Sequence, residues 1–443
     1  MNRIKCIHTR TSLSLSAAGF TLLLGLMALV PAASANEANL TRFGPETYVL
    51  EQGVPTTYSA TFRAVDGPAK LVLQDEGIDN AWIEINGSSV VESQDFNGNG
   101  EIVIALNLQK ENTIEVRVPG LPTGALVVRV TQVTEADFGI LRQGYFGLNS
   151  SDMVRQRAFY ETLGFIGEIY PAGPETSTTF AQSLGFPEDY LIHVSLHSLT
   201  DPPTQPFVDT VQFRGNSYRE EPPYANLNHI GMTYATYSTT DLDGDFAYLQ
   251  SEGVEFVSAP TVAPNGERFV FFKDQDGIFL KLIETTEGEG PTPGPDLVRL
   301  VNTNMNVADL DRTREFYRLL GFSESAPGSQ TGSGKFAAAH GFDGPIEFEG
   351  VDISLGEGTD GATLQLRQWK SPYDDEESYP RPVNHLGIDR INFYVDDLTA
   401  TIKTMNELGF EQLGPIGGGP DLGIVFFFDP DGIKVQFAGP AAE

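Results

Sequence analysis

An internal duplication constrains the fold of this chain more than any other feature. The segment RAFYETLGF at 157–165 returns as REFYRLLGF at 314–322. FKDQDGIFLKL at 272–282 returns as FFDPDGIKVQF at 427–437, and in both an apolar run enters an Asp-x-Asp-Gly turn and an alternating strand leaves it. Because the repeats keep the same order, they indicate two copies of one structural unit.

Each copy divides again into two similar halves. In each half, an expected strand leads to an Asp that can cap the following helix, and further strands follow the helix. We place the copies at 138–286 and 297–443, joined by a Gly- and Pro-rich linker at 287–296. The Pro-rich stretches 201–224 and 371–383 are predicted to be loops between halves. The four expected capping residues are Asp152, Asp241, Asp309 and Asp397.

Residues 36–137 have a different pattern. Short alternating segments are separated by Gly, Pro and Asn, and in NTIEVRVPG at 112–120 the apolar residues share one face. This pattern predicts a β-sandwich. The whole chain is therefore expected to be α+β: four βαβββ modules that follow an all-β domain.

Residues 1–35 are predicted to be a signal peptide. A basic start precedes the apolar run AAGFTLLLGLMALV, and ASA at 33–35 is typical of a cleavage site. An uncleaved membrane anchor is the alternative. We expect a secreted protein, periplasmic or extracellular, with no membrane contact after cleavage.

Composition excludes two classes of function. The formal net charge of −32 would repel nucleic acid, so we expect no nucleic-acid partner. The one cysteine, Cys6, lies in the signal sequence, so we expect no cysteine catalysis, disulfide or cysteine metal site in the mature protein.

The repeated segments resemble the vicinal-oxygen-chelate superfamily. The resemblance rests on LNSSDMVRQRAFYETLGF, MNVADLDRTREFYRLLGF and the closing Asp-x-Asp-Gly hairpins. It covers 138–286 and 297–440. The superfamily includes glyoxalase I, extradiol dioxygenases and bleomycin resistance proteins. The resemblance implies that paired modules curve into a cup in which His and Glu side chains hold a divalent metal. Lyase or dioxygenase chemistry would follow.

The residues at the implied ligand positions differ from that pattern. None is His or a carboxylate, and Lys281 and Arg390 are cations that would repel a metal ion. We therefore expect no metal centre and no cofactor. The eight positions are Tyr145, Ser195, Tyr234 and Lys281 in the first copy, and Asn302, Gln365, Arg390 and Gln436 in the second.

A remodelled metal site in the first copy is the alternative. His193, Ser195 and His197 alternate on one expected strand, so all three should face the cup, and His229 is a conceivable third ligand for zinc, iron or manganese. Tyr145, His193 and His197 are then the catalytic candidates. His229 and its counterpart His385 otherwise look structural.

The cup interiors are expected to be polar and to bind a small molecule. The ligand-binding candidates are the eight implied positions together with Arg367. Arg367 and Arg390 in the second cup could hold a carboxylate or phosphate with paired hydrogen bonds.

Three functions remain open from the sequence. The first is a secreted, metal-free protein that binds a small molecule, with an anion as one option. The second is a glyoxalase- or dioxygenase-like enzyme with a remodelled site, and the third is a non-catalytic extracellular scaffold. Because one chain supplies all four modules, we expect a monomer.

Overall fold

The computed structural model describes most of the chain after the expected signal sequence. Residues 1–34 of that sequence, with Cys6, lie outside the described residues. No helix in the described part is long and apolar enough to cross a membrane. The described residues are 35–49, 56–78, 80–96, 100–118, 124–165, 167–168, 174–175, 178–186, 191–200, 206–214, 221–288, 290, 294–356, 362–374, 376–379 and 382–441.

The N-terminal region is all-β, as predicted. Two four-stranded antiparallel sheets have the orders β1-β8-β3-β6 and β2-β7-β4-β5. In β7, Ile114, Val116 and Val118 are buried and alternate with exposed residues, and side chains of both sheets form one core. The elements are β1 (Asn36–Val49), β2 (Thr56–Arg63), β3 (Gly67–Glu76), β4 (Trp82–Ile85), β5 (Ser88–Val91), the 3-10 helix η2 (Ser93–Asp95), β6 (Gly100–Leu108), β7 (Glu111–Val118) and β8 (Ala125–Ala136).

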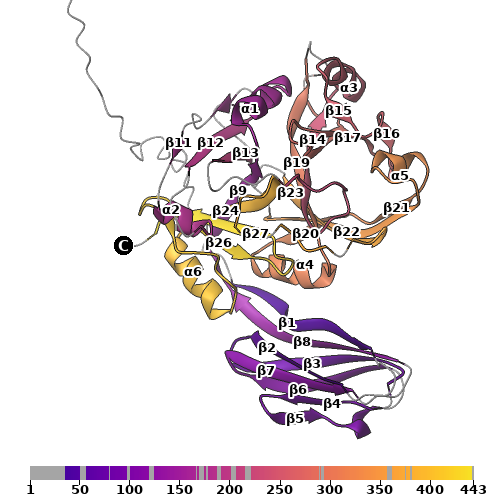
Figure 1. Ribbon diagram of the computed structural model, residues 1–443, viewed down its shortest axis with the longest axis vertical. Coiled ribbons are helices and arrows are strands. Elements are labelled where there is room, and N and C mark those ends of the chain that lie inside the picture. The colour runs from indigo at the N-terminus through magenta and orange to yellow at the C-terminus, as the bar shows by residue number, and fades with distance from the viewer. Residues whose placement is uncertain are drawn as a thin grey trace, which may run out of the picture. The chain divides into compact units, whose positions relative to one another are not determined.

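The rest of the described chain is mixed α+β and rich in strands (Figure 1). The first copy contains β9 (Ile140–Asn149), α1 (Met153–Thr162), β10 (Gly167–Glu168), β11 (Pro174–Glu175), α2 (Thr178–Ser183), β12 (Leu191–Ser198), β13 (Phe207–Arg214), β14 (Gly231–Thr239), α3 (Leu242–Ser251), β15 (Glu255–Phe256), β16 (Thr261–Val262), β17 (Arg268–Lys273) and β18 (Phe279–Glu284). The second contains β19 (Leu297–Asn306), α4 (Leu310–Leu319), β20 (Ser323–Pro327), β21 (Gln330–Gly332), α5 (Lys335–Ala339), β22 (Ile346–Ser354), β23 (Thr363–Ser371), β24 (Gly387–Val395), α6 (Leu398–Glu407), β25 (Gly417–Gly418), β26 (Gly423–Phe428) and β27 (Lys434–Gly439).

The two large sheets combine strands from both copies. The nine-stranded sheet has the order β10-β12-β13-β9-β24-β27-β26-β25, with β11 beside β12. The ten-stranded sheet has the order β15-β17-β18-β14-β19-β23-β22-β20, with β16 beside β17 and β21 beside β22. The expectation that each copy closes its own cup is therefore wrong. The strand after the linker, β19, pairs with β14 of the first copy, which leaves β9 and β24 to pair with each other.

The helix starts follow the predicted chemistry. The carboxylate of Asp152 accepts hydrogen bonds from the backbone N–H groups of Val154 and Arg155 at the start of α1. Asp241, Asp309 and Asp397 cap α3, α4 and α6 in the same manner. Each cap satisfies N–H groups that the first turn of a helix leaves free.

The Asp-x-Asp-Gly turns join the two halves of each copy. Asp276, in the turn before β18, accepts hydrogen bonds from Ser150, Ser151 and Arg155 beside α1. Asp431, in the turn before β27, accepts them from Ala308, Arg312 and Thr313 beside α4. The repeated turn thus reverses the chain direction between two strands and also binds the first helix of the same copy.

Each large sheet buries both faces. On the helix-facing sides, residues of both sheets contribute to one apolar core that includes Phe146 and Leu282. The opposite face of the nine-stranded sheet carries Tyr145, Phe207 and Phe426, and we call it the Arg390 face. The corresponding face of the ten-stranded sheet packs Tyr234, Phe271, Phe348 and Trp369, and we call it the Lys281 face.

Candidate functional site

The strand register locates the implied ligand positions in all four modules. On the first strands they are Tyr145, Tyr234, Asn302 and Arg390. These residues lie opposite Phe207, Phe279, Thr363 and Lys434 on the neighbouring parallel strands. Two residues further along those strands stand Asp209, Lys281, Gln365 and Gln436.

At the fourth implied ligand position of the nine-stranded sheet, the structure therefore has Asp209, where the sequence predicts Ser195. Residues 207–214 form β13, although the Pro-rich composition of 201–224 predicts a loop. The alternation within FVDTVQFR was the signal for a strand, but prolines on both sides obscured it. One carboxylate thus stands at a ligand position, contrary to the expectation from sequence.

His193, Ser195 and His197 do not face the cup. Their neighbours Val194 and Leu196 pack with Tyr145 on the Arg390 face, so the alternation of β12 turns the other three toward α1. His197 stacks on Tyr160 of α1 at 5.2 Å between ring centroids, and burial lowers its pKa to about 4. His193 lies beside Arg214, with 3.0 Å between Nε2 and Nη1. The structure thus gives these histidines no access to a site with Tyr145.

Arg390 is the centre of the Arg390 face. Its Nη2 donates to Asp209 Oδ2 at 2.7 Å, and its Nη1 donates to Asp389 Oδ1 at 2.7 Å and to Asn149 Oδ1 at 3.1 Å. Only 3% of Arg390 is exposed. Burial alone would lower its pKa, but the two carboxylates raise the pKa above its ordinary value. The cation at this ligand position is therefore already paired.

Two buried amides beside this ion pair have unused hydrogen-bonding capacity. Neither Oδ1 nor Nδ2 of Asn392 has a partner, and Asn392 is 0% exposed. Oε1 of Gln436, directly across the strand pair from Asn392, is also without a partner. The Gln436 side chain makes a hydrogen bond with Tyr145, whose pKa burial raises well above its usual value. Asn392 was not a sequence-based candidate, and its place two residues after Arg390 on the same strand was the available signal.

The Lys281 face has a different polar network. Lys281 pairs with Glu267 Oε1 at 2.5 Å and lies over the ring of Phe269, and burial lowers its pKa. A chain of hydrogen bonds runs from Arg367 to the hydroxyl of Tyr234, on to Gln365 and from the Gln365 amide to Asp352. Asn302 is buried at the edge of this chain, and its Oδ1 has no partner.

Helix α5 fills the Lys281 face with apolar and aromatic side chains. Phe336 and His340 at this helix pack against Phe269, Phe348 and Trp369. His340 is 4% exposed, and its Nδ1 lies 2.9 Å from the carbonyl oxygen of Phe336. Burial lowers the pKa of His340 to about 3, so the ring is neutral near pH 7.

Arg367 and Arg390 lie on different sheets and cannot hold one anion together. Arg367 donates to Tyr234 and stacks over Phe348, with 4.2 Å from the guanidinium carbon to the ring centroid. The predicted paired-arginine site for a carboxylate or phosphate is therefore wrong. The two arginines are separated because β24 pairs with β9 and so does not join the sheet of β19 and β23.

With a cation at one of its implied ligand positions, neither face fits the divalent metal of the superfamily as the chain stands. Tyr145, Asp209, Arg390 and Gln436 meet on one face, and Tyr234, Lys281, Asn302 and Gln365 on the other. Each set contains a buried cation and no histidine. Among the described residues, the group with a suitable ligand arrangement is His229, Asp374 and Glu376, and it excludes His193 and His197.

His229 and His385 belong to a four-ring stack, in line with a structural role. Successive ring centroids of His229, Tyr224, Tyr379 and His385 lie 3.7, 3.7 and 3.9 Å apart. The backbone N–H of each tyrosine donates to the hydroxyl of the other. The stack joins the two loops that connect the halves of the copies.

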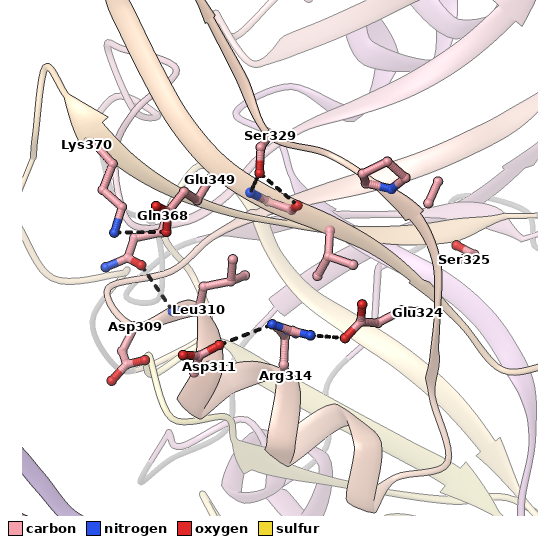
Figure 2. A pocket seen from close by; sticks show the side chains of 14 residues that line it. Asp309, Leu310, Asp311, Arg314, Glu324, Ser325, Ser329, Glu349, Gln368 and Lys370 are labelled. Atoms are coloured by element: carbon pink, nitrogen blue, oxygen red, sulfur yellow. Dashed lines mark hydrogen bonds and ion pairs between the residues drawn. The ribbon is translucent and has the colours of Figure 1, made fainter.

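A surface hollow of about 590 Å³ lies outside both faces, between α4 and the strands β20 and β22 (Figure 2). Figure 2 shows Arg314 directed toward Asp311 and Glu324, and Lys370 paired with Glu349. Both cations that line the hollow, Arg314 and Lys370, are already paired with carboxylates, and the lining carries more carboxylates than cations. It is therefore not a candidate ligand site.

Comparison with known proteins agrees with the resemblance. The model of the Glyoxalase/Bleomycin resistance protein/Dioxygenase superfamily matches residues 142–282 and 299–437. Glyoxalase I from Zea mays is 16% identical over 67% of this chain and 92% of its own, with a TM-score of 0.46. A putative dioxygenase from Bacillus subtilis is 13% identical over 68% of this chain and 86% of its own, with a TM-score of 0.42. No curated protein matches the chain. The two family matches cover most of the chain, which therefore belongs to the Glyoxalase/Bleomycin resistance protein/Dioxygenase superfamily.

Proposed function

We propose that this protein is a secreted, metal-independent member of its superfamily and that it binds a small molecule on the Arg390 face. The supporting observation is Asn392, a fully buried amide with no partner for either polar atom. An unsatisfied buried polar group costs about 1–3 kcal/mol, which a bound ligand recovers when it supplies the missing hydrogen bonds. The N-terminal sequence supports secretion.

The charges of the Arg390 face favour an uncharged ligand. Arg390 and Lys434 are buried there together with Asp209 and Asp389, so the formal charges cancel. An anion would find Arg390 already held by two carboxylates. Asn392 can donate and accept, and Gln436 can accept, so the matching groups are amides and hydroxyls.

The test compares small amides and polyols with small carboxylates in a thermal-shift screen, followed by calorimetric titration. We expect stabilisation by an uncharged compound and its loss in Asn392→Leu. Thr236→Val, at the equivalent register position on the Lys281 face, is the matched control and should retain binding. If only carboxylates stabilise the protein, or if Asn392→Leu binds as well as the parent, the assignment is wrong.

A non-catalytic scaffold is the second candidate, and the filling of the Lys281 face favours it. The apolar cluster there includes Phe336, Phe348 and Trp369, and it packs around Tyr234, one of the implied ligand positions. The purified protein would then bind no compound on either face. Metal analysis tests the enzyme alternative, because stoichiometric zinc, iron or manganese would contradict metal independence.

A further inference from the structure

The buried guanidinium of Arg390 is enclosed by oxygen atoms from three neighbouring strands. Asp209 comes from β13, Asn149 from β9 and Asp389 from β24. Gly147 of β9 leaves the space for the side chain, because a Cβ at this position would lie 2.3 Å from the guanidinium carbon. The strands therefore build a closed, cation-sized place around this group.

The donor atoms in this place are those that hard divalent cations select. Two carboxylates and the carbonyl oxygen of an amide surround one positive charge. Ions such as Mn²⁺ and Ca²⁺ prefer carboxylate and carbonyl oxygen. The unpartnered Oε1 of Gln436 lies nearby on β27 and could add a fourth oxygen.

We propose that Arg390 is a resident cation in place of a metal ion, and that the oxygens of Asp209, Asp389 and Asn149 form a latent divalent-cation site which its guanidinium keeps closed. In the native chain, the positive charge that balances the two carboxylates is then part of the protein itself. A chelator cannot remove this cation, and it needs no metal supply outside the cell. This inference concerns the ion-pair site and does not depend on a ligand at Asn392.

The experiment removes the guanidinium and offers free cations. In Arg390→Ala, Mn²⁺ should raise the melting temperature by several degrees with one ion bound per chain, measured by thermal unfolding and by the electron paramagnetic resonance signal of free Mn²⁺. Low millimolar guanidinium should also raise it. Wild-type protein should show neither response.

Two further variants isolate the cause. Asp209→Asn in the Arg390→Ala background should abolish Mn²⁺ binding. Arg367→Ala is the matched control, because Arg367 is equally buried but donates to the uncharged hydroxyl of Tyr234, and it should show no Mn²⁺ response. Equal Mn²⁺ responses of the Arg390 and Arg367 variants, or none in either, would overturn the proposal.

If Arg390→Ala does not accumulate as folded protein, Arg390→Met fills more of the vacated space. Its refolding yield with and without Mn²⁺ becomes the readout. A yield that Mn²⁺ raises only while Asp209 is present supports the latent site. A yield independent of Mn²⁺ contradicts it.

Discussion

The Arg390 face and the Lys281 face share one strand register but stabilise their buried cations differently. Arg390 is held by Asp209 and Asp389, both in the bodies of strands and almost inaccessible to water. Lys281 pairs with Glu267, whose side chain is 29% exposed, and lies over aromatic rings. One face thus uses a closed ion-pair network, and the other uses a partly hydrated pair surrounded by apolar side chains.

The two faces also differ in their uncharged groups. On the Lys281 face, Tyr234 and Gln365 pass hydrogen bonds from Arg367 to Asp352. On the Arg390 face, Asn392 and Gln436 keep unpaired atoms. Asn302 and Thr236 each leave one oxygen unpaired on the Lys281 face, whereas Asn392 leaves both a donor and an acceptor unpaired on the Arg390 face. Since the backbone positions are equivalent, this difference comes from the side chains.

Removal of the cations should give the largest contrast. Arg390→Met leaves two buried carboxylates without their partner and should cost about 3–5 kcal/mol of unfolding free energy. Lys281→Met leaves only Glu267, which water can reach, and should cost about 1–2 kcal/mol. Urea unfolding of both variants measures the difference. Equal losses would show that the two ion pairs are energetically alike.

Acid should weaken the Lys281 face through His340. Its pKa is about 3 in the folded protein and 6.5 ordinarily, so the neutral ring contributes stability above pH 6.5 that is lost as the pH falls toward 3. At pH 5 the loss should be about 2 kcal/mol. His340→Gln should flatten the fall in stability between pH 7 and pH 5.

The control for this pH dependence is His197→Gln. His197 has a pKa of about 4 and lies on the helix side of the other sheet, so it adds a separate decrease in the same direction. Each substitution should flatten only part of the profile. An unchanged slope in His340→Gln would contradict the burial of a neutral ring.

The uncharged groups should give the smallest contrast. Tyr234→Phe removes an acceptor from buried Arg367 and should cost about 1–2 kcal/mol. Asn392→Leu removes no hydrogen bond and should change stability by less than about 1 kcal/mol. A large loss in Asn392→Leu, measured by chemical unfolding, would mean that this amide has a structural partner.

The sequence predicts the elements better than their pairing. The repeated segments, the capping residues and the all-β N-terminal region are all visible as local patterns. The choice of partner for β9 depends on which strand edges remain free after β14 and β19 meet, and no local pattern records this. The predicted grouping of Arg367 with Arg390 failed for that reason.

The candidate site shows the same limit at the level of single residues. The family resemblance pointed to Tyr145, Arg390 and Gln436 through their spacing to the caps and turns, and the structure brings them to one face. The prolines around β13 concealed the strand that carries Asp209. Alternation shows that His193 and His197 share one face of their strand, but it does not show which side of the sheet that face is on. Partners such as Asn149, 241 residues from Arg390 in the chain, depend on tertiary contacts between distant segments.

The exchange of strands between copies has a consequence for the gene product when it is shortened. A chain that ends within the linker would leave the edges of both β9 and β14 uncovered, because β24 and β19 come from the missing copy. Uncovered strand edges recruit further strands. We expect such a fragment to associate with a second fragment through these edges.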